Sequence, residues 1–102
     1  MPSGVVVVLA SFQPRARKAA ELRTVLQTMV ENSRMEPGCE AYDFYESCGE
    51  PATYHLLERY SDAAALEKHR ASNHYRAYRD RLPDLLHQPV QATVLCEVDV
   101  AR

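Results

Sequence analysis

One uninterrupted apolar run, Val5–Ala10, constrains the fold of this chain more than any other feature. The run is too short for most helices, and its four consecutive valines favour a β-strand. A strand without alternating polar residues is typical of one that is buried on both faces. The chain has 102 residues, the length of a single domain, so residues 1–102 must cover both faces of this strand with little material.

A helix is predicted after this strand, between Pro14 and the turn signal Glu36-Pro37-Gly38. Proline is common at the first position of a helix, so we expect the helix to begin at Pro14. The apolar positions of this segment follow the spacing of one helical face: Leu22, Val25, Leu26, Met29 and Val30. The helix is therefore expected to pack this face against the sheet.

Two further strands, at 39–46 and 52–60, are predicted to form an antiparallel hairpin, because the turn-forming residues 47–51 separate them. Alternate side chains of a strand point to opposite faces of its sheet. In the second strand of the hairpin, one face therefore carries Tyr54, Leu56, Glu58 and Tyr60, and the other His55, Leu57 and Arg59.

Capping signals predict two short helices after the hairpin. Ser61-Asp62 precedes a helix expected over 63–70. Ser72-Asn73 predicts a break and a new short helix from His74 to about Leu82, because Pro83 follows and bounds it.

The last predicted strand, 90–100, alternates apolar and polar side chains over its whole length. The element order is therefore β-α-β-β-α-β, an α+β protein with a ferredoxin-like antiparallel sheet. Two helical regions can cover only one face of a four-stranded sheet, whereas Val5–Val8 favour cover on both. We therefore expect a homodimer whose two sheets pack together as a dimeric α+β barrel.

Composition and motifs exclude several classes of function. The formal net charge of −2 argues against nucleic acid and anionic membranes as partners, and 52–60 lacks the pattern of an RNA-recognition strand. The sequence has no phosphate-binding loop, dinucleotide motif or nucleophile elbow. It has no run near the ~20 apolar residues of a membrane span and no basic signal segment. Its three cysteines are an odd number, which fits a reducing compartment. We therefore expect a soluble, cytoplasmic protein without a cofactor.

His69 and Glu58 are the first candidates for chemistry. His69 shares the inward helical face of Ala65, Leu66 and Asn73, which places an imidazole among apolar groups. Glu58 lies in mid-strand, where a carboxylate is costly unless it is paired. A pair of the two would give a base whose tautomer the carboxylate fixes. Two alternatives remain: His69 as a satisfied core histidine, and Glu58 paired with an arginine at a dimer interface.

Tyrosines and a second histidine extend this region. Tyr75, Tyr78 and Leu82 form a stripe that is either core or the wall of a cavity with hydroxyl donors. His74 lies five residues after His69, which on one helix separates the two by about 140°. Joint metal binding by the two is therefore not expected unless the break at Ser72-Asn73 turns the chain, and we predict no metal.

Three segments together resemble the antibiotic biosynthesis monooxygenase (ABM) family, over essentially the whole chain. The matching residues are Glu36-Pro37-Gly38-Cys39-x-x-Tyr42, Leu57-Glu58-x-Tyr60-x-Asp62 and Ala65-Leu66-x-x-His69-x-x-Ser72-x-His74-Tyr75. The resemblance implies a dimeric α+β barrel. The family that the chain resembles includes cofactor-independent quinol and anthrone oxygenases. It implies that His69 lines the pocket, with Glu58, Ser72, His74 and Tyr75 near its rim or wall. The chain has no tryptophan, which disfavours haem degradation and anthrone oxidation.

The sequence thus predicts a cofactor-independent monooxygenase that oxidises a small aromatic or quinol-type substrate with dioxygen. His69 is the expected base, Glu58 its orienting carboxylate, and Tyr75 or His74 the oxyanion donor. Further residues are expected to bind substrate: Tyr54, Leu66, Ser72, Asn73 and Tyr78. Three alternatives stay open: an isomerase of a phosphorylated small carbonyl compound anchored by Arg59 or Arg76, a non-catalytic dimer that binds small aromatics, and a structural dimer with a filled core.

Overall fold

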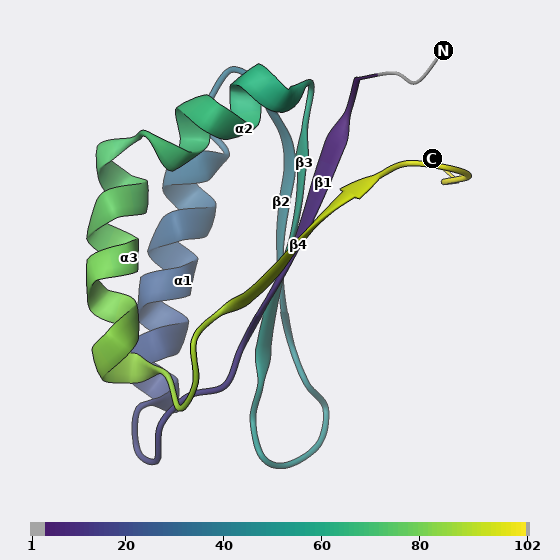
Figure 1. Ribbon diagram of the computed structural model, residues 1–102. Helices are drawn as coiled ribbons and strands as arrows, with labels where there is room; N and C mark the ends of the chain where they lie inside the picture. Colours follow the sequence, from purple (N-terminus) through teal and green to yellow (C-terminus); the bar gives the residue numbers. More distant parts are fainter. Residues whose placement is uncertain (1–3, 102) are drawn as a thin grey trace.

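The structure is a computed structural model that describes residues 4–101 (Figure 1). Its elements in chain order are β1 (Val6–Phe12), α1 (Ala19–Ser33), β2 (Cys39–Glu46), β3 (Tyr54–Tyr60), α2 (Ala63–Arg70), α3 (Asn73–Leu85) and β4 (Gln91–Cys96). The four strands form one antiparallel sheet in the order β2-β3-β1-β4. The predicted ferredoxin-like α+β fold is confirmed, with the last helical region divided into α2 and α3 as the capping signals indicate.

All three helices lie on one face of the sheet, and the core fills the space between them (Figure 1). Leu22 and Leu26 of α1 are fully buried, as their helical spacing predicts. From the sheet, Phe12 and Leu56 are buried against this helix layer. No helix among residues 4–101 is both long and apolar enough to cross a membrane.

The first helix starts later than Pro14, so that expectation is wrong. Residues 15–18 form a turn in which Arg17 adopts a left-handed conformation, with φ of 67°, and α1 begins at Ala19. Pro14 instead forms an isolated β-bridge with Leu86, and the backbone N–H of Arg15 donates to the carbonyl of Leu85 at 2.8 Å. The loop after β1 is therefore tied to the end of α3 before α1 can begin.

Pro83 does not end the last helix, as the sequence suggested, but lies inside α3, which continues to Leu85. A proline within a helix removes one backbone hydrogen bond. Here Leu82 and Leu85 extend the buried face on both sides of it, with 4% and 0% of their surfaces exposed. The burial of these side chains outweighs the missing hydrogen bond, so the helix continues.

The last strand is shorter than predicted, because its ladder with β1 ends at the pair Val6–Cys96. Val98 is 98% exposed and Val100 is 53% exposed, although both continue the alternating pattern. Alternation marks residues that are able to form a strand, but a strand also requires a neighbour to bond with. β3 likewise starts at Tyr54, where its pairing with β1 begins, rather than at residue 52.

The second face of the sheet carries no helix, as Figure 1 shows. Val8 of the apolar run is 4% exposed beneath the helices, whereas Leu9, on the opposite face, is 40% exposed. On the same face, Leu57 of β3 pairs with Leu9 and Leu95 of β4 pairs with Val7, and these two leucines are 38% and 41% exposed. We call this surface the outer sheet face. The single chain therefore leaves uncovered one of the two faces for which the apolar run favours cover.

The turn between α1 and β2 passes directly against α2. A Cβ atom added to Gly38 would lie 2.3 Å from the Cβ atom of Ala65, so only glycine fits between the two backbones. The carbonyl of Gly38 also accepts a hydrogen bond from the N–H of Ser61, at 2.9 Å. This close approach holds the preceding residue pair, Glu36-Pro37, beside α2.

We expect Gly38→Ala to lower the free energy of unfolding by about 1–3 kcal/mol, the usual cost of forcing an extra methyl group into a packed contact. Gly49→Ala is the matched control, because a Cβ atom at Gly49 meets nothing within 4 Å. Urea denaturation of the two variants measures the difference. Equal stability of both would show that α2 moves away from the turn without cost.

Candidate functional site

The centre of the candidate site is His69, which is 2% exposed and lies on the inner face of α2. Asp62 fixes the start of this helix, because its carboxylate accepts a hydrogen bond from the N–H of Ala65 at 2.8 Å. Tyrosine rings surround the imidazole, with centroids 5.3 Å away for Tyr60 and 5.2 Å away for Tyr75. His69 is thus almost shielded from water on all sides.

Glu36 holds one edge of the imidazole. Its Oε2 atom lies 2.9 Å from His69 Nδ1, and its Oε1 atom lies 3.2 Å from the same nitrogen. A carboxylate can only accept here, so Nδ1 carries the proton, and Nε2 keeps its lone pair. Sequence reasoning treated Glu36 as part of a helix-stopping turn and missed this role.

His74 reaches the same carboxylate, because the chain turns between α2 and α3. Ser72 caps α3 by accepting from the N–H of Tyr75 at 3.2 Å, and its hydroxyl donates to the carbonyl of His69 at 2.6 Å. The turn brings His74 Nε2 to 2.5 Å from Glu36 Oε2 and the two imidazole centroids to 6.0 Å. The 140° separation expected for one continuous helix therefore does not occur.

Glu58 faces the other edge of the imidazole, from β3. Its Oε1 atom is 3.9 Å from His69 Nε2, which is ion-pair distance but too long for a hydrogen bond. The same oxygen accepts a hydrogen bond of 2.6 Å from the hydroxyl of Tyr60. Glu58 thus lies on the helix-covered face of the sheet, which is the face that the pairing with His69 requires. The carboxylate hydrogen-bonded to His69 is Glu36, not Glu58.

Burial shifts the acid–base properties of both groups. Desolvation raises the pKa of Glu58 to about 7, although the hydrogen bond from Tyr60 opposes this shift. Desolvation also lowers the pKa of His69, against the hydrogen bond and charge of Glu36. The two opposite shifts favour the uncharged forms of both groups. A buried carboxyl and a neutral imidazole side by side are typical of sites that move protons.

His69 and Glu58 line a common small space, which we call the inner hollow. Its volume is about 30 Å³, room for roughly one water molecule. The hollow lies between the helices and the sheet and is lined by Val8, Ala10, Tyr42, Glu58, Leu66, His69, Arg70, Tyr75, Tyr78, Arg79, Val90 and Ala92.

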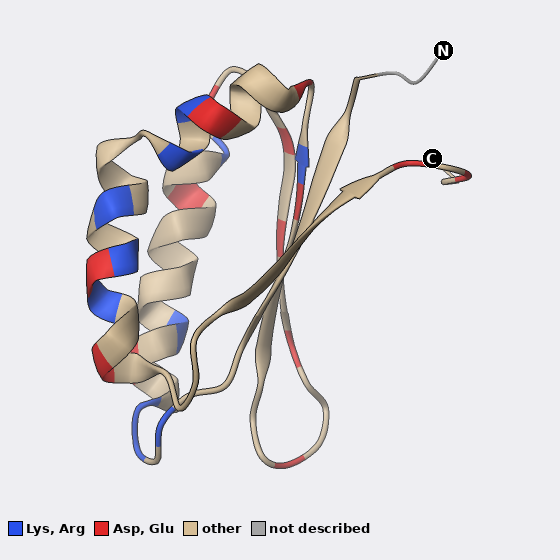
Figure 2. Ribbon diagram, in the orientation of Figure 1, with Lys and Arg blue, Asp and Glu red and all other residues tan. Residues whose placement is uncertain are grey.

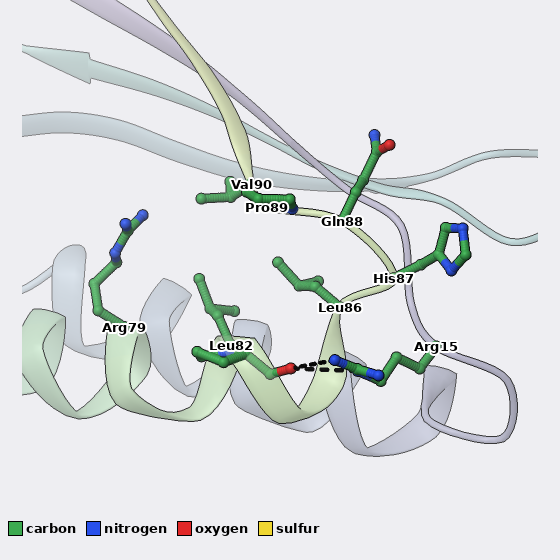
Figure 3. Close-up of a pocket in the computed structure, with 9 residues that line it drawn as sticks. Arg15, Arg79, Leu82, Leu86, His87, Gln88, Pro89 and Val90 are labelled. Atoms are coloured by element: carbon green, nitrogen blue, oxygen red, sulfur yellow. Dashed lines mark hydrogen bonds between the residues drawn. The ribbon is translucent and has the colours of Figure 1, made fainter.

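A larger depression, the outer groove, adjoins the inner hollow and shares Arg79 and Val90 with it (Figure 3). Its volume is about 350 Å³. Figure 3 shows Leu82 and Leu86 among the residues that line it. The guanidinium of Arg15 donates two hydrogen bonds to the carbonyl of Pro83, at 3.2 and 3.0 Å. A small organic molecule typically needs about 300–1,000 Å³, so the outer groove has a suitable size and the hollow alone does not.

The structure brings together some of the residues predicted from sequence and separates others. Leu66, Tyr75 and Tyr78 line the inner hollow beside His69. Tyr54 packs against Phe44 in the core, with ring centroids 5.6 Å apart, and does not line the hollow.

The remaining predicted residues lie elsewhere. Ser72 is a helix cap, and Asn73 is an exposed residue at the start of α3. Of the cations proposed as phosphate anchors, Arg59 forms ion pairs with Glu40 and Glu97, and Arg76 is exposed on α3.

Arg70, which the sequence left unassigned, and Arg79, which was expected on a solvated face, are both exposed and also line the inner hollow. Figure 2 shows that α2 and α3 carry several Lys and Arg positions together with acidic ones, whereas β1 and β4 carry no charged residue. Helical spacing alone could have placed Arg79 near this region, because it lies four residues after Tyr75 on α3. The site therefore combines a buried proton-binding pair with positive charge at its helical side.

The fold and this site define a small α+β protein with a buried histidine between two carboxylates. The sequence profile of the antibiotic biosynthesis monooxygenase family matches residues 5–81. The chain belongs to this family.

Curated relatives support the same classification. A protein of Mycobacterium tuberculosis named "Putative monooxygenase Rv0793" is 43% identical over 96 residues, which cover 94% of each chain. "Putative monooxygenase YcnE" of Bacillus subtilis is 30% identical over 86 residues, covering 84% of this chain and 90% of that protein. The family and these names support a monooxygenase-like function.

Solved structures agree with the fold. The structure of Rv0793 superposes with a TM-score of 0.91 and 42% identity, covering 96% of this chain and 99% of that one. A Pseudomonas aeruginosa protein, PA3566, superposes with a TM-score of 0.88 and 25% identity, covering 97% and 99% of the two chains.

The raised pKa of Glu58 predicts how stability depends on pH. The folded protein binds the proton of Glu58 more tightly than the unfolded chain does. The protonated carboxyl therefore adds to the free energy of unfolding fully below about pH 4.5, and this stabilisation is lost as the pH rises through about 7. The Glu58→Gln variant, whose amide oxygen can still accept from Tyr60, should therefore be more stable than the wild type by roughly 2–3 kcal/mol above pH 7.

Urea denaturation at pH 5 and pH 8 tests this prediction. Glu67→Gln, at an exposed position of α2, is the control and should follow the wild-type pH profile. If Glu58→Gln also runs parallel to the wild type, Glu58 does not bind its proton more tightly in the folded state.

Proposed function

We propose that this protein is a cofactor-independent monooxygenase that oxidises a small phenol or hydroquinone with dioxygen. The observation that carries the proposal is the environment of His69: Nδ1 is held by Glu36 at 2.9 Å, and Nε2 faces the inner hollow. A neutral, oriented and desolvated imidazole is suited to remove a proton from a phenolic hydroxyl. The ABM family membership supports the same reaction class.

The reaction needs no external reductant. Deprotonation converts the hydroquinone into an electron-rich anion, which transfers electrons to dioxygen and forms a carbon–oxygen bond to the ring. The resulting peroxide loses water, with cleavage of the O–O bond. One oxygen atom stays on the product, a hydroxyquinone, and the other leaves as water, so that hydroquinone and dioxygen account for all atoms and electrons.

Each group at the hollow has a role in this scheme. His69 is the base, and Glu36 is a positioning residue that fixes its tautomer. Glu58 is a buried carboxyl that can exchange a proton with the same edge of the ring. Tyr75 and Tyr78 line the hollow and are suited to donate to the substrate oxygen, which assigns the oxyanion contact to tyrosine. His74 faces Glu36 and is absent from the lining of the hollow.

The substrate is proposed to lie mainly in the outer groove, with its reacting hydroxyl in the inner hollow. The groove has an apolar floor in Leu82, Leu86 and Val90, which suits an aromatic ring. Arg79 stands where the groove and the hollow meet, so it can stabilise the anion formed by deprotonation.

Replacing the base tests the mechanism. His69→Gln should lower the rate of oxygen uptake with a responsive hydroquinone by about 10²–10⁴-fold, because it removes the proton acceptor. Oxygen consumption is measured with a panel of substituted hydroquinones, after subtraction of their spontaneous oxidation. Glu67→Gln on the exposed side of the same helix should keep the wild-type rate.

Unchanged turnover in a folded His69→Gln protein would remove His69 from the mechanism. Saturable binding of aromatics without oxygen uptake by the wild type would support a binding protein instead. The melting temperature of each variant separates a loss of chemistry from a loss of fold.

One observation favours a second candidate function, the isomerisation of a phosphorylated small carbonyl compound. Arg79 lines the outer groove as well as the inner hollow and could hold a phosphate in the groove, in place of the two arginines expected from sequence. An isomerase keeps its activity without oxygen, whereas the proposed monooxygenase loses all of it. Turnover under anaerobic conditions distinguishes the two.

We further propose that two copies pair through the outer sheet face. Leu9, Leu57 and Leu95 form an apolar surface on adjacent strands, and two such faces together would cover both sides of β1. β1 and β4 carry no charge along their whole lengths, so their packing against a second copy leaves few charges to desolvate (Figure 2).

Light scattering after size-exclusion chromatography tests this pairing. The wild-type protein should have twice the 11.6 kDa mass of one chain, and Leu9→Glu should shift it to the single-chain mass, because a charge is then buried at the interface. Met35→Glu is the control, since Met35 is 83% exposed in the turn after α1 and away from this face. A monomeric wild type would contradict the proposal.

A further inference from the structure

The geometry points to a binding site for a divalent first-row transition metal, such as Zn²⁺, formed by Glu36, His69 and His74. These three residues come from the turn after α1, from α2 and from the first turn of α3. One ligand atom from each lies within 4.8 Å of the others. The site lies behind His69, on the opposite edge of the imidazole from the inner hollow.

Two imidazole nitrogens converge on a single carboxylate oxygen. His69 Nδ1 is 2.9 Å from Glu36 Oε2, and His74 Nε2 is 2.5 Å from the same atom. Metal–ligand bonds of about 2.0–2.1 Å place neighbouring tetrahedral ligands roughly 3.3 Å apart, so each of the two distances from the carboxylate oxygen must lengthen by less than about 1 Å to admit an ion. Glu36 lies in a turn rather than in a helix or strand, and its side chain is 18% exposed, which leaves it room to move.

The chemistry of the ligand set selects the class of metal. Imidazole nitrogens favour zinc, copper, iron and nickel, whereas Mg²⁺ and Ca²⁺ prefer sites made of oxygen alone. Two histidines and one carboxylate leave at least one coordination position open for water. The His74 side chain is 24% exposed, so an ion can reach the site from solvent without opening the core.

The far edge of His69 carries the second feature expected of a metal ligand. A histidine that binds a metal commonly donates its other N–H to a carboxylate, which orients the ring. Glu58 Oε1 lies 3.9 Å from His69 Nε2, close enough for a short movement to complete this bond. The hydroxyl of Tyr60 holds the Glu58 carboxylate in place at 2.6 Å.

Metal binding has a consequence that rests on the proposed function. An ion on Nδ1 leaves the imidazole proton on Nε2, which is the atom proposed to accept the proton of the substrate. The same ring therefore cannot bind metal and act as the base. Zn²⁺ should inhibit oxygen uptake, and a chelator should restore it.

The direct test is calorimetric titration of the chelator-treated protein with Zn²⁺ alone, without substrate. It is carried out in a Cys48→Ser, Cys96→Ser background, because both of these cysteines are exposed and would bind zinc themselves. We expect saturable binding of one ion per chain. Co²⁺ serves as a second probe, because its visible spectrum reports coordination by nitrogen and oxygen and reveals any thiolate ligand, including Cys39.

Variants locate the ion. Glu36→Gln and His74→Gln should each weaken Zn²⁺ binding by at least about tenfold, because each removes one of three ligands. His87→Gln is the matched control: His87 is an exposed histidine outside the cluster, and its loss should leave the affinity unchanged. Thermal denaturation without metal confirms that each variant is folded, and Zn²⁺ should raise the melting temperature only where it binds.

Absence of saturable Zn²⁺ binding would overturn the proposal, as would equal affinities of the Glu36→Gln, His74→Gln and His87→Gln proteins. A thiolate band in the Co²⁺ spectrum would also overturn it. These outcomes are independent of the monooxygenase proposal, because the titration contains no substrate. Zinc binding without any oxygen uptake would leave the metal site standing and remove the catalytic one.

Discussion

The site depends on one constraint, which is the burial of the His69 imidazole with a carboxylate at each edge. Burying a polar ring is costly unless it is hydrogen-bonded, and Glu36 supplies that bond at Nδ1, while Glu58 faces Nε2 at 3.9 Å without a hydrogen bond. Because the two carboxylates come from opposite sides, the ring has a defined tautomer and a defined direction. Proton transfer towards the hollow and metal binding behind the ring both follow from this arrangement.

Two local features of the chain position the side chains of the site: a close contact at Gly38 and a turn held by Ser72. Gly38 allows the turn to contact Ala65 of α2, which brings Glu36 beside His69. Ser72 bonds to both helices that it joins, and the resulting turn of the chain points His74 at the same carboxylate. Neither residue touches the inner hollow, yet each determines where a functional side chain lies.

The candidate site and the outer sheet face lie on opposite sides of one sheet. Alternate residues of β3 serve both, because Glu58 faces the helices while Leu57 faces outward. A shift of this strand by one residue would move a carboxylate into the outer sheet face and an apolar group into the site. The strand register therefore fixes the site and the proposed pairing surface together.

The sequence by itself determined the order of the elements, the α1 stripe, the helix break at Ser72 and the inward face of His69, because periodicity and capping are local properties. It misplaced the start of α1 and the ends of α3 and β4, because pairing and burial elsewhere in the chain decide where an element begins and stops. Only the tertiary structure decided that Glu36, 33 residues from His69, is the carboxylate bonded to it. A side chain on a turn has no periodicity that could reveal its direction, so its partner is known only when the turn and the helix are seen in contact.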